Sequence, residues 1–132
     1  MDLAKDKKEV VATGAAPGAI GPYSQAVKVG NLMFTSGQLP IDPATGKIPD
    51  GPISVRAHQA IKNLQGIITA VGSSFDDVVK TTVFLTNIGD FQEVNAVYAE
   101  YFKPPFPARS AIQVAALPLA TDIEIEAVVL VK

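Results

Sequence analysis

The sequence predicts an α+β fold, a two-layer domain in which two helices pack on one face of a mixed β-sheet. Segments with strand or helix periodicity follow one another in the order strand, strand, strand, helix, strand, helix, strand, strand. Each helical segment carries a single apolar stripe, and the last strand carries apolar residues on both faces. We expect one domain over residues 1–132, in which the charged residues 1–8 are a frayed N-terminal segment.

Three strands are predicted before the first helix. Residues 9–13 can form the first, and residues 26–29 and 32–38 can form a hairpin around a turn at Gly30-Asn31.

Three residues near this hairpin are candidates for a binding site. Pro22 stiffens the chain before Tyr23, whose ring can line a pocket or simply pack against its neighbours. Ser36 precedes Gly37, a position where a ligand or another backbone can come close. Ser36 can equally be an ordinary strand serine, so the sequence leaves both roles open.

The two helices are predicted from apolar residues spaced three and four positions apart. Ser54 is the expected N-cap of the first helix, which ends near Gly72. Asp90 is expected to begin the second helix, with Glu93 in capping-box spacing. Asn95 lies beside the second stripe, where its side chain can be either a hydrogen-bond donor in a pocket or an ordinary surface amide. The stripes consist of Ala57, Ile61, Leu64, Ile68 and Val71, and of Phe91, Val94, Tyr98, Tyr101 and Phe102.

Strands are also predicted over residues 78–86, 110–115 and 122–131. The last strand has one wholly apolar face, and its other face carries Glu124 and Glu126 followed by further apolar residues. At least one of these glutamates is therefore expected at the boundary of a covered surface. Burial raises a carboxyl pKa, and such a group can orient or deprotonate water. A pair of solvated charges is the alternative.

The segment Lys103–Ala111 leads stiffly into Arg109, because three prolines restrict the backbone before it. An arginine presented in this way is suited to bidentate binding of a planar anion. A surface or interface salt bridge is the other interpretation.

Composition limits the classes of function. The chain has no cysteine, which excludes disulfides and thiolate nucleophiles, and its one histidine, His58, makes a multi-histidine metal site nearly impossible. Its net charge of −2 provides no basic stripe, so nucleic-acid binding is the weaker hypothesis. A charged share of only 18% and a mean hydropathy of +0.26 predict a homo-oligomer. No apolar leader or membrane-length run is present, so we expect a soluble cytoplasmic protein.

Six motifs, in this order and spacing, resemble those of the RidA/YjgF family of reactive-intermediate (enamine/imine) deaminases. They are Ile20–Ala26, Thr35–Gln38, Val79–Val83, Asp90–Phe91 with Val94–Asn95, Phe106–Ser110 and Ile123–Ala127. The resemblance implies a homotrimer whose sheets form a central barrel with clefts between subunits. It also implies hydrolysis of 2-iminopropanoate and 2-iminobutanoate, tautomers of enamines such as 2-aminoacrylate, to 2-oxoacids and ammonia without a cofactor.

The resemblance also assigns roles to residues. It makes Arg109 the carboxylate-binding arginine and Glu124 the water-associated glutamate, and it places Tyr23, Ser36, Gly37 and Asn95 in the pocket. Many relatives carry a cysteine at the position of Ala111, so any role of that thiol is absent here. The alternatives are a non-enzymatic trimer that binds small carboxylates or acts as a chaperone-like module, and a ribonuclease or translation inhibitor.

Overall fold

The structure is a computed structural model and describes residues 7–132. Most of the segment predicted to be frayed, residues 1–8, lies outside the described residues. The elements are β1 (Glu9–Val11), β2 (Ala26–Val29), β3 (Leu32–Thr35), α1 (Ile53–Ala70), β4 (Val78–Leu85), α2 (Phe91–Tyr101), β5 (Ala108–Gln113) and β6 (Ile123–Leu130).

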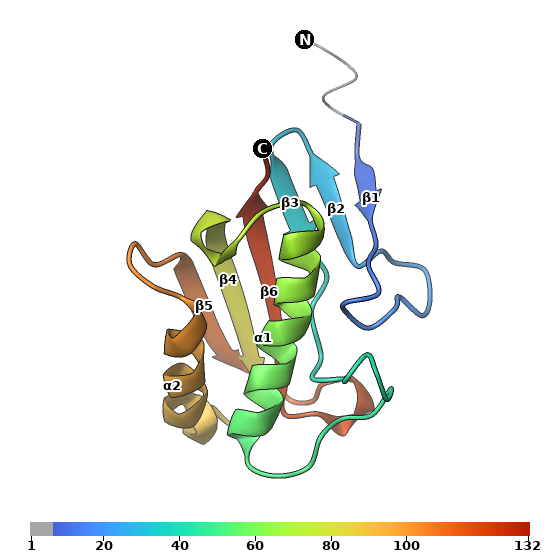
Figure 1. Cartoon of the computed structure of the whole chain (residues 1–132). Coiled ribbons are helices and arrows are strands. Elements are labelled where there is room, and N and C mark those ends of the chain that lie inside the picture. Colours follow the sequence, from blue (N-terminus) through green and yellow to red (C-terminus); the bar gives the residue numbers. More distant parts are fainter. Residues whose placement is uncertain (1–6) are drawn as a thin grey trace.

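The strands form one six-stranded sheet with the order β1-β2-β3-β6-β4-β5, and both helices lie on the same face of it (Figure 1). The β4–β5 pair is parallel and the other pairs are antiparallel. This mixed sheet with two helices on one face confirms the predicted α+β class and the predicted order of elements.

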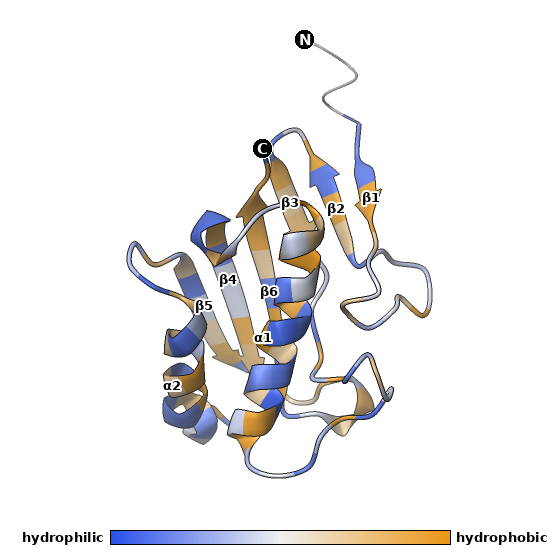
Figure 2. Ribbon diagram, in the orientation of Figure 1, coloured by the Kyte–Doolittle hydropathy of each residue, from blue (hydrophilic) through white to orange (hydrophobic). Residues whose placement is uncertain are grey.

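The core fills the space between the sheet and the helices. Along β6, the side chains of Ile123, Ile125, Ala127 and Val129 are buried, as the period-two pattern of the sequence predicts. Hydrophobic and hydrophilic residues follow one another along both helices (Figure 2). The buried residues recur at helical spacing, so each helix presents an apolar face to the sheet and a polar face to solvent.

The opposite face of the sheet carries no helix, yet it is apolar in several places. Phe34 in β3, Leu130 in β6 and Ile112 in β5 expose 48%, 41% and 44% of their surface, respectively. Phe34 pairs with Val128, so these side chains continue across neighbouring strands. An uncovered apolar surface of this kind is typical of a face that contacts another protein.

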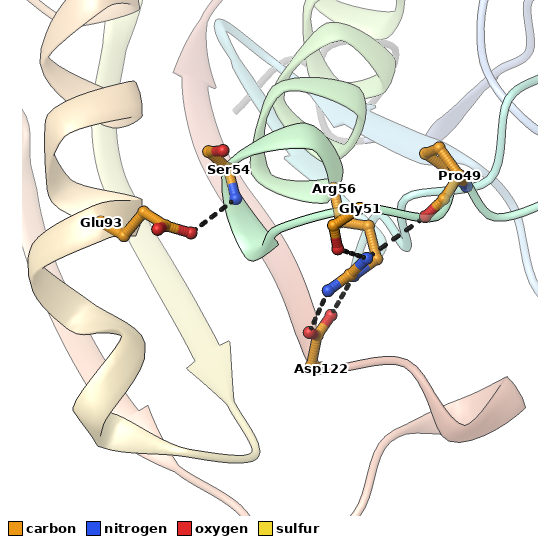
Figure 3. A network of polar contacts seen from close by, with 6 residues as sticks. All are labelled: Pro49, Gly51, Ser54, Arg56, Glu93 and Asp122. Atoms are coloured by element: carbon orange, nitrogen blue, oxygen red, sulfur yellow. Dashed lines mark hydrogen bonds and ion pairs between the residues drawn. The ribbon is translucent and has the colours of Figure 1, made fainter.

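One predicted helix cap is wrong, and the other is confirmed in position only. The N-cap of α1 is Pro52 rather than Ser54, whereas Asp90 is the N-cap residue of α2 as predicted, but its side chain makes no cap hydrogen bond. Instead, the amide of Ser54 donates to Glu93 Oε2 at 3.0 Å (Figure 3), so this pair links the starts of the two helices. The sequence predicts Ser54 and Glu93 as caps of their own helices, because a contact between two helices leaves no signal in the local sequence.

A bidentate ion pair fixes the start of β6 against α1. Arg56 donates to both carboxylate oxygens of Asp122 at 2.8 Å and to the carbonyl oxygens of Gly51 and Pro49 (Figure 3). The hydrogen bond to Asp122 is the main cause that raises the pKa of Arg56. Because Asp122 precedes Glu124 by two residues, this pair also holds the strand end that carries Glu124.

The backbone departs from regular strand geometry in two places. A shift in register between Val78 and Lys80 buries Val78 and exposes Val79, so the predicted faces of β4 are wrong at this end. The strand predicted over residues 32–38 stops at Thr35, and Gln38 then pairs with Ile125 in an isolated bridge. Ser36 and Gly37 therefore lie in a break of the ladder. Within residues 7–132, no helix has the length and apolar character that a membrane crossing requires.

Candidate functional site

Arg109 lies on the edge strand β5 and is held by side chains of α2. Its Nη1 donates to Asn95 Oδ1 at 2.7 Å, and its Cζ lies 5.1 Å from the ring centroid of Phe91 and 4.7 Å from that of Tyr98. The guanidinium borders a hollow of about 410 Å³, lined by Asn95, Tyr98, Ala99, Phe106, Pro107 and Arg109. Among residues 7–132 no carboxylate pairs with Arg109, so its remaining N–H groups are available to an anion.

Glu124 lies on β6, with its carboxyl group directly against Gly37. A Cβ atom added to Gly37 would overlap that carboxyl group, so glycine is required for this close approach. Burial, and then the neighbouring charge of Glu126, raise the pKa of Glu124 above its ordinary value of 4.5. The predicted boundary position of one glutamate in this pair is thus confirmed for Glu124, which is partly buried.

Tyr23 and Gly37 border a second hollow, of about 290 Å³, whose other walls include Ile20, Leu39 and Leu119. The Tyr23 ring is 54% exposed, so it lines a surface rather than packing in the core. The amide of Gly37 has no hydrogen-bond partner within residues 7–132. This part of the chain therefore combines an exposed aromatic ring, a free amide and a carboxylate of raised pKa.

Ser36 supports the loop that carries Tyr23. Its Oγ donates to the carbonyl oxygen of Ser24 at 2.6 Å, and its amide donates to the carbonyl oxygen of Gln25 at 2.9 Å. Both donors of Ser36 are occupied, so its hydroxyl oxygen can serve a ligand only as an acceptor.

In a single chain, Arg109 and Glu124 lie on opposite faces of the sheet. Arg109 pairs with Thr81, which is buried beneath the helices, so Arg109 points to the helical side. Glu124 pairs with Phe84, three residues after Thr81, and therefore points to the opposite side. The candidate residues thus form two half-sites: Arg109 with Asn95, and Glu124 with Gly37, Tyr23 and Ser36.

The sequence reasoning did not identify the aromatic residues beside Arg109. Phe91 and Tyr98 were assigned only to the apolar stripe, although Asn95 interrupts that stripe at helical spacing from both. This spacing was the available signal. Ala111 lies two residues after Arg109 and packs against the core. Within residues 7–132, no group of three His, Cys, Asp or Glu side chains could hold a metal ion.

A family model described as Endoribonuclease L-PSP matches residues 13–131, so the chain belongs to that family. This is the RidA/YjgF family, and solved structures of the E. coli YjgF gene product and of a Psychrobacter RidA match the chain. The resemblance of the six sequence motifs is therefore confirmed.

Individual relatives carry more specific names. A human protein named 2-iminobutanoate/2-iminopropanoate deaminase is 53% identical over 121 residues, which are 92% of this chain and 88% of the human protein. The crystal structure of a putative endoribonuclease from Thermotoga maritima has a TM-score of 0.91 and 52% identity, and the match covers 94% of this chain and 98% of the other. E. coli TdcF with bound serine has a TM-score of 0.88 and 42% identity, with 94% and 99% covered.

Proposed function

We propose that the chain is a deaminase that hydrolyses 2-imino acids, such as 2-iminopropanoate and 2-iminobutanoate, to 2-oxoacids and ammonia. The observation that carries this proposal is that the chain presents both an available guanidinium, on Arg109, and a partly buried carboxylate of raised pKa, on Glu124. The human relative named for this activity matches nearly the whole chain, which supports the same reaction class.

Arg109 binds the substrate carboxylate in this proposal. Two parallel N–H···O bonds from a guanidinium fix both the position and the plane of a carboxylate, which orients the adjacent C2 carbon. Asn95 holds Nη1 and so limits the rotation of the guanidinium. The serine bound to TdcF also carries a carboxylate, and this supports the assignment of a small organic acid to the site.

Glu124 acts on water. Its carboxylate takes a proton from a water molecule as the water oxygen bonds to C2 of the imine. Glu124 returns this proton to the imine nitrogen, and the new hydroxyl group on C2 gives its own proton to the same nitrogen. The C–N bond then breaks, ammonia leaves with the bonding electron pair, and the C2 oxygen becomes the carbonyl of the 2-oxoacid. A raised pKa makes Glu124 a stronger base than an ordinary carboxylate, and its carboxyl group lies directly against Gly37.

The complete site forms between two copies of the chain. Because Arg109 and Glu124 point to opposite faces of their own sheet, one copy supplies Arg109 with Asn95 and the next supplies Glu124, Gly37 and Tyr23. The uncovered apolar face that includes Phe34, Ile112 and Leu130 favours association of this kind. We propose a homotrimer, with this face turned inward as a central barrel.

The test mixes two inactive variants. Arg109→Ala and Glu124→Gln each lack one half-site and should each lose the acceleration of ammonia release from enzymatically generated 2-aminoacrylate. When the two are unfolded together and refolded at equal amounts, random assembly pairs an intact Arg109 with an intact Glu124 at about one quarter of the interfaces of a closed ring. About one quarter of the parent activity should return. No recovery, with mixed oligomers present, would place the site within one chain and reject the proposal.

Ribonuclease activity is a second candidate because the family description and the Thermotoga structure carry that name. The net charge of −2 argues against tight RNA binding. A ribonuclease signal that remains through purification and depends on Glu124 would favour this candidate. A trimer that binds 2-oxobutanoate without accelerating imine hydrolysis would favour a non-enzymatic carboxylate-binding module.

A further inference from the structure

Three residues of α2 surround the guanidinium of Arg109. Phe91, Asn95 and Tyr98 are separated by four and three positions, so they share one face of the helix. Phe91 and Tyr98 are two turns apart, which corresponds to about 10 Å along the axis. The Cζ atom of Arg109 lies over both rings, 5.1 Å from the centroid of Phe91 and 4.7 Å from that of Tyr98.

Tyr98 is itself fixed from two sides. Its hydroxyl is hydrogen-bonded to Thr81 Oγ1 at 2.8 Å, and its ring is stacked on Phe102 with a centroid distance of 4.1 Å and an interplanar angle of 20°. Tyr98 and Thr81 expose only 6% and 0% of their surface. Burial raises the pKa of Tyr98, so its phenol stays neutral at physiological pH.

Thr81 connects these contacts to the backbone of Arg109. In the parallel β4–β5 pair, Thr81 is the Cα partner of Arg109. One residue of β4 therefore sets both the position of the Arg109 backbone and the position of the ring on which its guanidinium rests. Thr81 contacts Tyr98, Tyr98 contacts Arg109, and Arg109 pairs with Thr81, so the three residues form a closed loop of contacts.

We propose that Tyr98 is a positioning residue for carboxylate binding, which presents the Arg109 guanidinium to the substrate through its ring face and is itself held by Thr81. This inference rests on the proposed function, because it concerns how the anion site is prepared. An exposed arginine otherwise loses rotamer freedom when it binds an anion, and that loss weakens affinity. Contact with a fixed aromatic ring restricts the guanidinium before the substrate arrives.

The ring and the hydroxyl of Tyr98 have separate roles, so two substitutions distinguish them. Tyr98→Leu removes the ring and should weaken the binding of 2-oxobutanoate, measured by calorimetry, about tenfold. Tyr98→Phe keeps a ring that still stacks on Phe102 and should change affinity by less than about threefold. For imine hydrolysis, Tyr98→Leu should raise KM in parallel and leave kcat within about twofold, because it removes an interaction common to ground and transition states.

A second pair of variants tests the role of Thr81. Thr81→Val leaves the buried hydroxyl of Tyr98 without a partner and should weaken 2-oxobutanoate binding about threefold, through displacement of the ring. Adding Tyr98→Phe to Thr81→Val removes that hydroxyl and should restore affinity to the level of Tyr98→Phe alone. Rescue of affinity in the double variant would show that the unpaired hydroxyl of Tyr98, and not the loss of Thr81 itself, displaced the ring.

Three results would overturn the inference: parent-like binding by a folded Tyr98→Leu variant, equal losses in the Leu and Phe variants, or no rescue in the double variant. If Tyr98→Leu does not fold, the Thr81→Val variant and its double variant with Tyr98→Phe carry the test, and unchanged 2-oxobutanoate affinity in folded Thr81→Val would overturn the inference. A parent protein that binds 2-oxobutanoate but does not hydrolyse imines would reject the proposed function. Weaker binding by Tyr98→Leu in that case would still support the positioning role.

Discussion

Gly37→Ala is expected to inactivate the protein by displacing one carboxyl group without disturbing the fold. The Cβ atom of the new alanine would lie 2.5 Å from the carboxyl carbon of Glu124, and ordinary van der Waals contact begins at 3.4 Å. The difference, 3.4 − 2.5 Å, means that this carbon must move by about 0.9 Å. The overlap is with the end of a flexible side chain, so Glu124 will yield rather than the backbone.

A displacement of this size costs about a hundredfold in rate when the moved group must meet a reacting atom, or about 2.7 kcal/mol in the activation free energy. The assay is ammonia release from 2-aminoacrylate generated in the same cuvette by a dehydratase. Gly14→Ala is the matched control, because a Cβ atom at Gly14 meets nothing within 4 Å. The control should keep the parent rate.

A double-mutant cycle decides whether Gly37 acts through Glu124. In a Glu124→Gln background the carboxylate proposed to act on water is already absent, so Gly37→Ala should lower the residual rate little further. If Gly37→Ala causes the same fold-loss in both backgrounds, or if the single variant keeps parent activity while folded, then the reasoning from this close approach is wrong.

Three further outcomes are expected. Activity should fall as the pH decreases through the raised pKa of Glu124, and Glu126→Gln should move this acidic limb of the pH–rate profile to lower pH, because the Glu126 charge contributes to raising that pKa. Folding stability should fall as the pH rises from 4.5 through the raised pKa of Glu124, because in this range the folded state binds more protons than the unfolded state. In thermal melts, Glu124→Gln should lack this decrease. The same pH dependence in the variant and the parent would contradict the assignment. Gly66→Ala should cost about 1–3 kcal/mol in unfolding free energy, because its Cβ atom would overlap the backbone of Ala15, and a melt like that of the parent would show that this loop yields freely.

The order and type of the elements were predictable because each is encoded locally. The alternation of buried residues along β6 and the apolar stripe of α1 both appear in the sequence as simple periods. The caps were not predictable in the same way. Glu93 has the spacing of a capping box, but its carboxylate binds the amide of Ser54, which is 39 residues away in the chain.

For the candidate site, the sequence indicates which residues are candidates but not how they are grouped in space. The sequence predicts that the side chains of Arg109 and Ser110 point to opposite faces of the sheet, but it does not indicate which face the helices cover. That follows only from the register, in which Arg109 pairs with the buried Thr81. The contact between Arg109 and Tyr98 depends on the same register, because Arg109 must point to the face of the sheet that carries α2.

In the proposed homotrimer, the position of the two half-sites on opposite faces of the sheet gives association of the chains a chemical role. A carboxylate of raised pKa such as Glu124 and an available guanidinium such as Arg109 would form an ion pair if they met in one chain, and each would then lose its function. Placing a sheet between them keeps both groups free of one another within the chain. In the proposed assembly they meet only where a second copy brings its own half-site, together with substrate, to the edge strand β5. The apolar face that favours association and the chemistry proposed for the site would then both follow from one sheet with helices on a single side.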